Sequence, residues 1–355
     1  MASLSTLTGR AGRPSGQAPA VALLALVLAA SVLSLSSGAA GLGVTKVVSA
    51  LMGEGLSPSD RVVLFDIRLP RLILGLMVGA ALAVSGVLLQ GLFRNPLADP
   101  GIVGVSAGAG LGAILAIVLG GLLPYQLSAL PGPYLVPLAA GLGGWMTTLL
   151  LYRAATAGRR TDVAMMLLAG IAISALAMAG TGVLTFLADD QQLRDLTFWS
   201  MGSLAGATWV KILAALPLMG IAVASAPGLA RGLNALALGE AQAAHMGIDV
   251  QRLKRRTILA AAAATGAAVA MSGGIGFVGI VVPHLLRQAL GPDHRRLIPH
   301  AALLGGALLV LADLVSRMII APAELPIGIL TALIGAPVFL WMLLHRQQVK
   351  GRQGA

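Results

Sequence analysis

An uncharged run of 22 residues, from Leu72 to Phe93, is the feature that most limits what this chain can fold into. As an α-helix it would be about 33 Å long, which is enough to cross the hydrocarbon core of a bilayer. The run begins after Arg68–Arg71 and ends at Arg94–Pro100, where two X-Pro steps disfavour helix and the charged side chains need water. Another uncharged run follows at once. This stretch therefore predicts one membrane crossing, a sharp polar turn and a return.

The rest of the chain is organised in the same way. Hydrophobic residues make up 57% and charged residues only 10%, whereas a soluble domain carries about a quarter charged residues. Long apolar runs, rather than ten-residue alternation, predict helices and not a barrel. The expected fold class is an all-α polytopic membrane protein with about ten transmembrane helices. The predicted crossings lie near 20–43, 70–92, 102–123, 134–152, 163–187, 209–227, 257–273, 276–291, 297–319 and 325–344.

The charges in the loops predict the orientation. With the amino terminus in the cytoplasm, 17 of the 24 Lys and Arg residues fall on inner segments, as the positive-inside rule requires. Both termini are then cytoplasmic, and residues 44–68 form a polar excursion on the outer side. We expect the first apolar segment to be a retained helix rather than a signal peptide, although Ser36–Ala40 offers small residues for cleavage. The expected organisation is a tail (1–20), one ten-helix domain (21–345) and a second tail (346–355).

A short pattern occurs twice. The pattern GAAxAxSG spans residues 79–86 in the second crossing and residues 266–273 in the seventh. Those two crossings run in opposite directions, which indicates an inverted repeat, a recurring plan of transporters. The Ser and Gly that end each copy are predicted to allow close helix packing, with lining of a pathway as the alternative: Ser85, Gly86, Ser272 and Gly273.

No catalytic motif is present. None of the four lysines is followed by Ser or Thr, so the chain has no phosphate-binding GxxxxGK[ST] loop, and any ATP must be hydrolysed by another subunit. The chain has no cysteine, which excludes disulfides and thiolate metal sites. The net charge of +11 does not indicate nucleic-acid binding, because the arginines lie in short loops between apolar runs.

The largest predicted cytoplasmic insert is 228–256. Within it, Ala235–His245 is rich in helix-forming residues and is followed by Gly247, which predicts one short helix outside the membrane. Its apolar side, formed by Leu236, Leu238 and Met246, has no lipid to cover it. We therefore favour a docking helix for a cytoplasmic motor over a solvated loop.

Few ionisable residues fall inside the predicted spans. Asp313 and Arg317 are one helical turn apart, which predicts an ion pair in preference to a proton- or sodium-coupling site at Asp313. Among the five histidines, only His284 is a candidate to face a pathway, because it follows Pro283 in a short crossing that the proline is expected to interrupt. We favour an interior histidine over a ligand there, and no metal site is predicted.

Several segments together resemble a known family. In order along residues 60–345, they are similar to the FecCD/BtuC-like permeases of ATP-binding-cassette (ABC) importers, which carry iron-siderophores, haem and vitamin B12. The segments are Arg68–Arg71, the first GAAxAxSG copy, Arg94–Pro100, Trp199–Leu204, Leu236–Glu240, Gly276–Gly279 with Pro283 and His284, and Glu324–Gly328.

This resemblance implies an inverted-repeat, type II importer fold in the bacterial inner membrane. It also implies a homodimer, two cytoplasmic ATPase subunits that bind the ATP, and a periplasmic haem- or siderophore-binding protein, with no cofactor in this chain. Three outer arginines, Arg68, Arg71 and Arg317, would meet acidic residues of the binding protein. The ATPase coupling loop would include Leu236, Leu238, Gly239, Glu240, Ala241 and Gly247, although Glu240 and Gly247 are one residue further apart than in the usual pattern.

Within the family, Leu193–Trp199 and the turn at 94–100 look most like haem permeases. Haem is therefore the favoured substrate, with a ferric siderophore or cobalamin as alternatives. A proton-coupled secondary transporter that uses Asp313 is the alternative from another class. A passive channel has no charged ring or filter-like sequence to support it.

Overall fold

The computed structural model describes residues 17–38, 43–52, 55–122, 134–157 and 160–353. Within these ranges the chain is a bundle of helices with one antiparallel pair of two-residue strands, β1 (Thr156–Ala157) and β2 (Arg160–Thr161). Most of the predicted tail 1–20 and residues 39 and 40 of the cleavage-like segment lie outside the described residues. The helices are α1 (Ala18–Ser36), α2 (Val44–Leu51), α3 (Pro58–Val62), η1 (Val63–Arg68), α4 (Leu69–Leu92), η2 (Pro100–Val103), α5 (Val105–Leu119), η3 (Gly120–Leu122), α7 (Leu135–Ala154), α8 (Val163–Leu187), α9 (Asp190–Ser200), α10 (Trp209–Ser225), η5 (Ala226–Leu229), α11 (Ala230–Leu236), α12 (Glu240–His245), α13 (Val250–Ser272), α14 (Val278–Leu290), α15 (His294–Met318) and α16 (Ile327–Gln353).

Each predicted crossing coincides with a helix of the described chain: α1, α4, α5, α7, α8, α10, α13, α14, α15 and α16. Seven stretches of the described residues are long and apolar enough to span a bilayer, and α14 and the apolar part of α16 are shorter. Helix α13 is not among the seven, because its first two turns carry four basic residues. The all-α polytopic fold class is confirmed.

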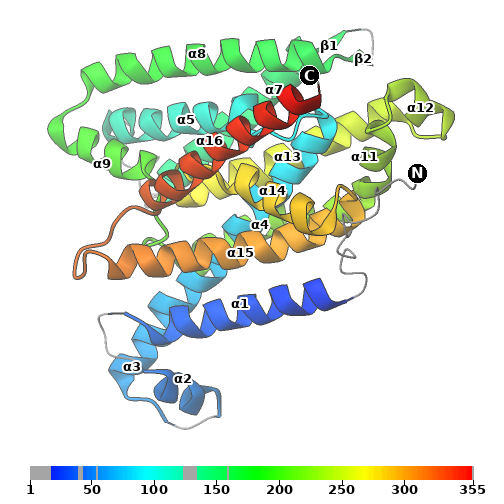
Figure 1. The fold of residues 1–355 in the computed structure, drawn as a ribbon. Helices are drawn as coiled ribbons and strands as arrows, with labels where there is room; N and C mark the ends of the chain where they lie inside the picture. Colours follow the sequence, from blue (N-terminus) through cyan, green and yellow to red (C-terminus); the bar gives the residue numbers. More distant parts are fainter. Residues whose placement is uncertain (1–16, 39–42, 53–54, 123–133, 158–159, 354–355) are drawn as a thin grey trace, which may run out of the picture.

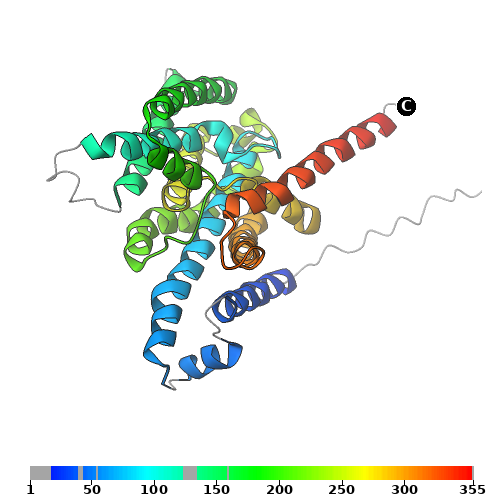
Figure 2. The same cartoon turned by 90° about the vertical axis from the view of Figure 1, so that its left-hand side faces the viewer.

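Helix α4 lies at the centre of the bundle, where it packs against α10, α13, α14 and α15 (Figures 1 and 2). Small residues on α4 make this possible, since its Gly79 backbone lies directly against Gly305 of α15. By contrast, α1 lies at the edge, against α15, and little of it is buried. The first GAAxAxSG copy therefore occupies the core of the fold.

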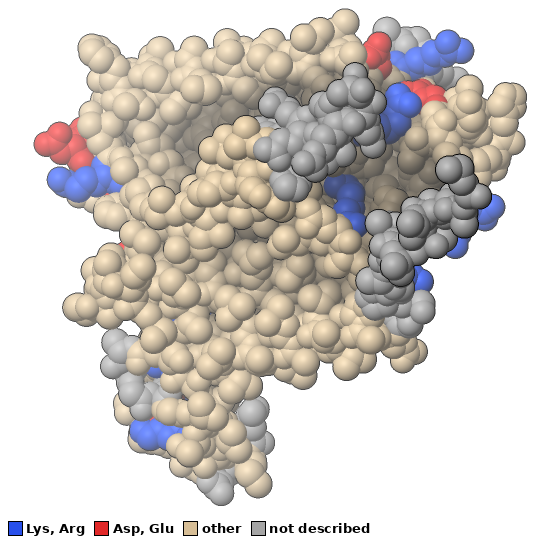
Figure 3. All heavy atoms as spheres, in the orientation of Figure 1, with Lys and Arg blue, Asp and Glu red and all other residues tan. Residues whose placement is uncertain are grey.

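The bundle has two ends, which we name from Figure 1. The α12 end carries α11, α12 and the β1–β2 pair, and the α9 end carries α9, α3 and the turn between α15 and α16. On the face drawn in Figure 3, Lys, Arg, Asp and Glu gather toward these two ends, and most of the surface between them is uncharged. This is the distribution expected of a protein whose middle faces lipid.

The predicted polar excursion at 44–68 is largely helical. Helix α2 is followed by α3, which Ser57 caps by accepting a hydrogen bond from the Asp60 amide. Helices α3, η1 and α4 then run on as one continuous helix from Pro58 to Leu92. A helix can run through this segment because no helix-breaking residue lies between Pro58 and Pro70, and a proline near a helix start is tolerated.

The predicted interruption at Pro283 is wrong, since α14 continues through this proline from Val278 to Leu290. A proline removes the hydrogen bond to the carbonyl four residues earlier, which here is that of Gly279. The Gln90 side chain of α4 supplies the missing donor, with Nε2 3.0 Å from the Gly279 oxygen. Arg287 of α14 in turn donates to Gln90 Oε1. The proline is therefore accommodated by a neighbouring helix.

Candidate functional site

The predicted docking helix is two short helices. Helix α11 ends at Leu236 and α12 begins at Glu240, so the single helix expected over Ala235–His245 is broken at residues 237–239. Gly239 has φ +115°, a conformation that L side chains rarely adopt. Gly239 disfavours a continuous helix, but the helix-forming residues on both sides of it favour the single helix that was predicted.

The apolar side of this segment is split in the same way. Leu236 is buried, whereas Leu238 is 65% exposed and Met246 is 57% exposed at the surface of the α12 end. Leu238 lies in the break before α12 and Met246 directly after it, so the two ends of this short helix carry exposed apolar side chains, which makes the surface a candidate protein contact. Ala241 follows Glu240 on the exposed side of α12, and Gly247 (φ +80°) ends that helix.

Glu240 reaches back into the bundle. Its carboxylate lies 2.9 Å from the ammonium of Lys254, a residue of α13 that is only 2% exposed. The same ammonium donates to the Thr161 carbonyl of β2 at 2.8 Å, and the Thr161 amide donates to Gln251 Oε1 of α13 at 2.9 Å. We call these four residues, Glu240, Lys254, Thr161 and Gln251, the Lys254 node.

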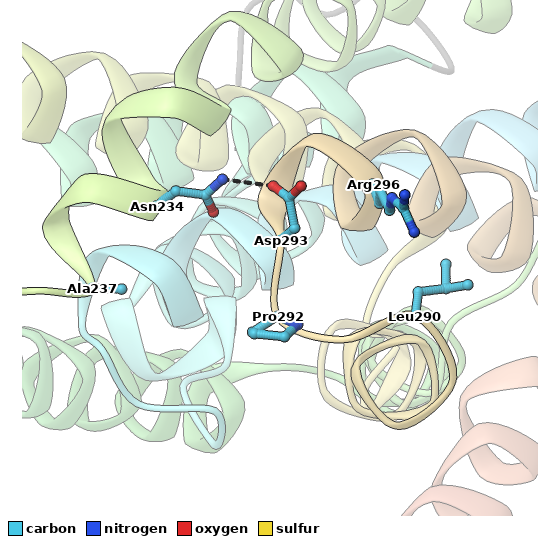
Figure 4. Close-up of a pocket in the computed structure, with 6 residues that line it drawn as sticks. All are labelled: Asn234, Ala237, Leu290, Pro292, Asp293 and Arg296. Atoms are coloured by element: carbon cyan, nitrogen blue, oxygen red, sulfur yellow. Dashed lines mark hydrogen bonds between the residues drawn. The ribbon is translucent and has the colours of Figure 1, made fainter. Parts of the chain in front are cut away.

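A second contact holds α11 in place. Asn234 of α11 donates to Asp293 Oδ1 at 2.6 Å, and its own side-chain oxygen accepts from the His294 amide at 2.9 Å (Figure 4). Burial would raise the pKa of Asp293, but hydrogen bonds from the Arg295 amide and from Asn234, with two nearby arginines, hold that pKa below its usual value. Helix α11 is thereby attached to the start of α15.

A cavity of about 440 Å³ lies beside this contact. In Figure 4 it lies between α11 and the turn that joins α14 to α15. Because its wall includes Ala237 in the break before α12, the cavity forms part of the same surface as the exposed Leu238. The residues that line it are Asn234, Ala237, Leu290, Pro292, Asp293 and Arg296.

The α9 end contains a buried cluster of charges. Arg71 of α4 is 8% exposed and makes bidentate hydrogen bonds to both Asp313 (2.9–3.1 Å) and Glu324 (2.8 and 2.9 Å). The predicted Asp313–Arg317 ion pair is present at 3.1 Å. We call Arg71, Asp313, Glu324 and Arg317 the Arg71 cluster. Its two arginines and two carboxylates balance, as buried charges require.

The other outer arginine is held by backbone. Arg68 is 5% exposed, and its guanidinium donates to the Leu35 carbonyl of α1 at 2.5 Å. Arg317 also contacts α1, since its Nη2 lies 3.1 Å from Ser34 Oγ. The three arginines predicted to meet a partner protein thus lie together, and within this chain they join α1, α4 and α15.

The paired Ser and Gly positions lie at close contacts between helices. The Ser85 hydroxyl donates to the Ala81 carbonyl and, at 3.1 Å, lies near the Ala261 carbonyl of α13. Gly86 lies where α14 crosses α4, so a Cβ there would come within 2.0 Å of the Gly279 oxygen. In the second copy, Ser272 donates to its own helix and Gly273 lies against the Trp199 carbonyl.

His284 is half-buried on α14, with its Nε2 2.7 Å from Gln288 Nε2. Among the described residues no group of three or more His, Cys, Asp or Glu could hold a metal ion.

Several of these contacts have little signal in the sequence. Lys254, Thr161 and Asn234 lie in polar segments with no motif around them, and nothing local pairs Lys254 with Glu240. Gln90 is an exception in part, because a proline inside a helix always leaves a carbonyl that needs another donor. Glu324 lies in a segment that resembles the family, but the sequence does not indicate which residue forms an ion pair with it.

Comparison with known proteins places this arrangement in a family. The FecCD transport family matches residues 26–345. The hemin transport system permease protein HmuU of Yersinia pestis is 48% identical over 285 residues, which cover 80% of this chain and 83% of that protein. The vitamin B12 import system permease protein BtuC of Salmonella typhi is 40% identical over 328 residues, 91% of this chain and 94% of that protein.

A solved structure agrees with the sequence relatives. An ABC transporter of the metal-chelate type, in an inward-facing conformation, superposes with a TM-score of 0.80 at 34% identity, covering 92% of this chain and 98% of that one. The resemblance noted in the sequence is therefore confirmed, along with the type II permease fold. This chain belongs to the FecCD transport family and is a permease of the ABC importer class.

Proposed function

We propose that this chain is the permease subunit that carries haem across the bacterial inner membrane, with separate ATPase subunits supplying the energy. The observation that carries the choice of haem is the 48% identity to the hemin permease over 285 residues. Cobalamin permeases are 40–42% identical over somewhat longer stretches, so cobalamin is the principal competing substrate. A ferric siderophore is the third.

The α12 end is the surface we assign to the ATPase subunits, and it would face the cytoplasm. Its exposed Leu238 and Met246 offer an apolar contact, and the neighbouring cavity could receive a side chain of the partner. Two copies of the chain would form the pathway between them. Closure of the ATPase subunits would push α12 and so open the pathway to one side at a time.

The α9 end would then receive the binding protein. Arg68, Arg71 and Arg317 remain our candidates for the docking residues, but Arg71 already binds two carboxylates within the chain. Docking through Arg71 would therefore require a carboxylate of the partner to replace Glu324, whose side chain is 41% exposed, rather than Asp313, whose side chain is 4% exposed.

Proton coupling through Asp313 is the weaker alternative. A coupling carboxylate must lose and regain its proton during transport, whereas Asp313 lies between the guanidinium groups of Arg71 and Arg317. These two ion pairs give Asp313 a structural role between α4 and α15. Membership of an ABC importer family also points to ATP as the energy source.

Uptake into proteoliposomes tests the proposal. The vesicles would contain this protein and its ATPase subunits, with ATP inside and the loaded binding protein outside, and haem, cobalamin and a ferric siderophore would be compared. We expect ATP-dependent accumulation of haem above that of the other two. ATP-dependent uptake of cobalamin or siderophore alone would exclude haem, and uptake without ATP would exclude the importer mechanism.

A further inference from the structure

The buried ammonium of Lys254 joins three separate segments of the α12 end. Lys254 belongs to α13 and is 2% exposed. Its Nζ donates to Glu240 Oε2 of α12 at 2.9 Å and to the Thr161 carbonyl of β2 at 2.8 Å. One side chain therefore connects the candidate docking helix to a helix of the core and to the turn between α7 and α8.

Breaking the ion pair between Lys254 and Glu240 is energetically costly. A buried ammonium needs a counter-charge and hydrogen-bond acceptors, because desolvation penalises an unpaired charge heavily. Among the described residues, the only carboxylate paired with Lys254 is that of Glu240. If α12 moved while α13 stayed in place, the ammonium would lose its counter-charge. The two helices are thus expected to move together.

A second hydrogen bond fixes β2 to the same turn of α13. The Thr161 amide donates to Gln251 Oε1, three residues before Lys254. Strand β2 pairs with β1, and these strands join the end of α7 to the start of α8. A displacement of α13 at Lys254 is therefore passed to the α7–α8 connection as well.

The neighbouring helix α11 packs on α13, where Gly232 lies against Leu253, and has a further attachment to α15. Asn234 binds Asp293 and the His294 amide at the start of α15. Between α11 and α12 the chain breaks at residues 237–239, where Gly239 has positive φ. Helix α12 is therefore joined to α11 through an irregular segment, whereas its ion pair joins it directly to α13. Helix α13 itself packs against α4, α5, α7 and α10, so its movement reaches the centre of the bundle.

We propose that Lys254 is the positioning residue through which movement of α12 is transmitted to α13 and to the α7–α8 connection. This inference rests on the proposed function, in which ATPase subunits act on α12. It assigns Lys254 no contact with ATP or with the transported substrate. Its role is to couple ATP hydrolysis to transport, so that each ATP hydrolysed leads to import of substrate.

The test measures substrate imported per ATP hydrolysed, in proteoliposomes that contain the complete complex and use haem or cobalamin, whichever the wild type imports. We expect Lys254→Met to keep the ATPase subunits bound and hydrolysing ATP, while import per ATP falls about tenfold, the equivalent of one charge-assisted hydrogen bond. Lys254→Arg, which keeps the charge and the donors, should restore most of the ratio. A purely structural lysine would not change this ratio.

Two further variants keep the test decisive. Lys211→Met is the matched control, because Lys211 Nζ also donates to a backbone carbonyl, that of Gly206 at 2.7 Å, but joins no docking helix. Glu240→Ala truncates a half-exposed side chain and removes the link to α12, while Lys254 keeps its bond to the Thr161 carbonyl. This variant decides the question if Lys254→Met fails to fold. We expect it to lower import per ATP as well, and the double variant Lys254→Met with Glu240→Ala to be no worse than Lys254→Met alone.

The outcomes separate the two proposals. If the wild-type complex does not bind its ATPase subunits or shows no ATP-dependent uptake, the proposed function fails. If the wild type transports and both Lys254→Met and Glu240→Ala import as much per ATP as the wild type, the role of Lys254 is refuted. Loss of ATPase binding in Glu240→Ala, with an unchanged ratio in Lys254→Met, would make the contact a docking feature and would also refute it.

Discussion

The Arg71 cluster and the Lys254 node lie at opposite ends of the molecule and have the same plan. In each, a buried cation is paired with a half-exposed carboxylate, since the side chains of Glu324 and Glu240 are 41% and 44% exposed. The difference is in the second partner. Arg71 also binds Asp313, a buried carboxylate, whereas Lys254 binds only the neutral Thr161 carbonyl.

Because of this difference, removing the half-exposed carboxylate has different consequences for the buried cation at the two ends. Without Glu324, Arg71 keeps a buried carboxylate partner in Asp313, which it shares with Arg317. Without Glu240, Lys254 has no paired carboxylate among the described residues. Loss of the half-exposed carboxylate should therefore disturb the α12 end more than the α9 end.

The largest expected effect is at Asp313. Asp313→Asn would leave Arg71 and Arg317 with Glu324 as their one carboxylate, and removing one member of a buried ion pair costs about 3–5 kcal/mol. We expect a marked drop in the thermal unfolding temperature of the protein in detergent. Asp190→Asn, at an exposed acid of the α9 end, is the control. A loss equal to that of the control would show that the Arg71 cluster carries little stability.

The next largest effect on stability is expected for Glu240→Ala, because this change leaves the buried ammonium of Lys254 without its carboxylate. A hydrogen bond to a charged group contributes about 1.5–3 kcal/mol, and the half-exposed carboxylate places the cost near the lower value. Unfolding of the purified protein by denaturant would measure it. Glu240→Gln, which keeps an acceptor for Lys254, should lose less, and an equal loss in both variants would contradict the account.

Glu324→Ala should be milder than Glu240→Ala, since Arg71 keeps Asp313. A surface ion pair contributes about 1 kcal/mol or less, and we expect a loss in that range. The same denaturant unfolding compares the two variants side by side. If Glu324→Ala proved the more damaging of the two, the contrast between the two ends would be wrong.

The smallest effect concerns pH at the α12 end. The pKa of Asp293 is below its usual value in the folded protein, so this carboxylate stabilises the fold above the unfolded pKa of about 3.9, and the contribution is lost as pH falls through the folded pKa. The stability gap between wild type and Asp293→Asn should therefore narrow below about pH 4, by about 0.5 kcal/mol for so exposed a group. Unfolding midpoints at pH 6 and pH 3.5 measure this, and a gap that widens on acidification would reverse the assignment.

Part of this contrast was available from the sequence. Asp313 and Arg317 are one turn apart on a predicted helix, and that spacing alone predicts their ion pair. The exposure of Leu238 also followed, because the segment around it lies outside the apolar runs. The break at Gly239 was missed, because helix-forming residues flank this glycine on both sides and local composition does not show which signal prevails.

The sequence by itself determined the ten membrane crossings, their approximate ends and the family. The cost of placing charge in lipid is large and local, so each uncharged run fixes a span without reference to the rest of the fold. Only the tertiary structure decided which side chains meet: Lys254 with Glu240 across 14 residues, Gln90 with Gly279 across 189, and Arg71 with Glu324 across 253. The physical reason is that a hydrogen bond or ion pair depends on a few ångströms of separation, and helix packing sets that separation.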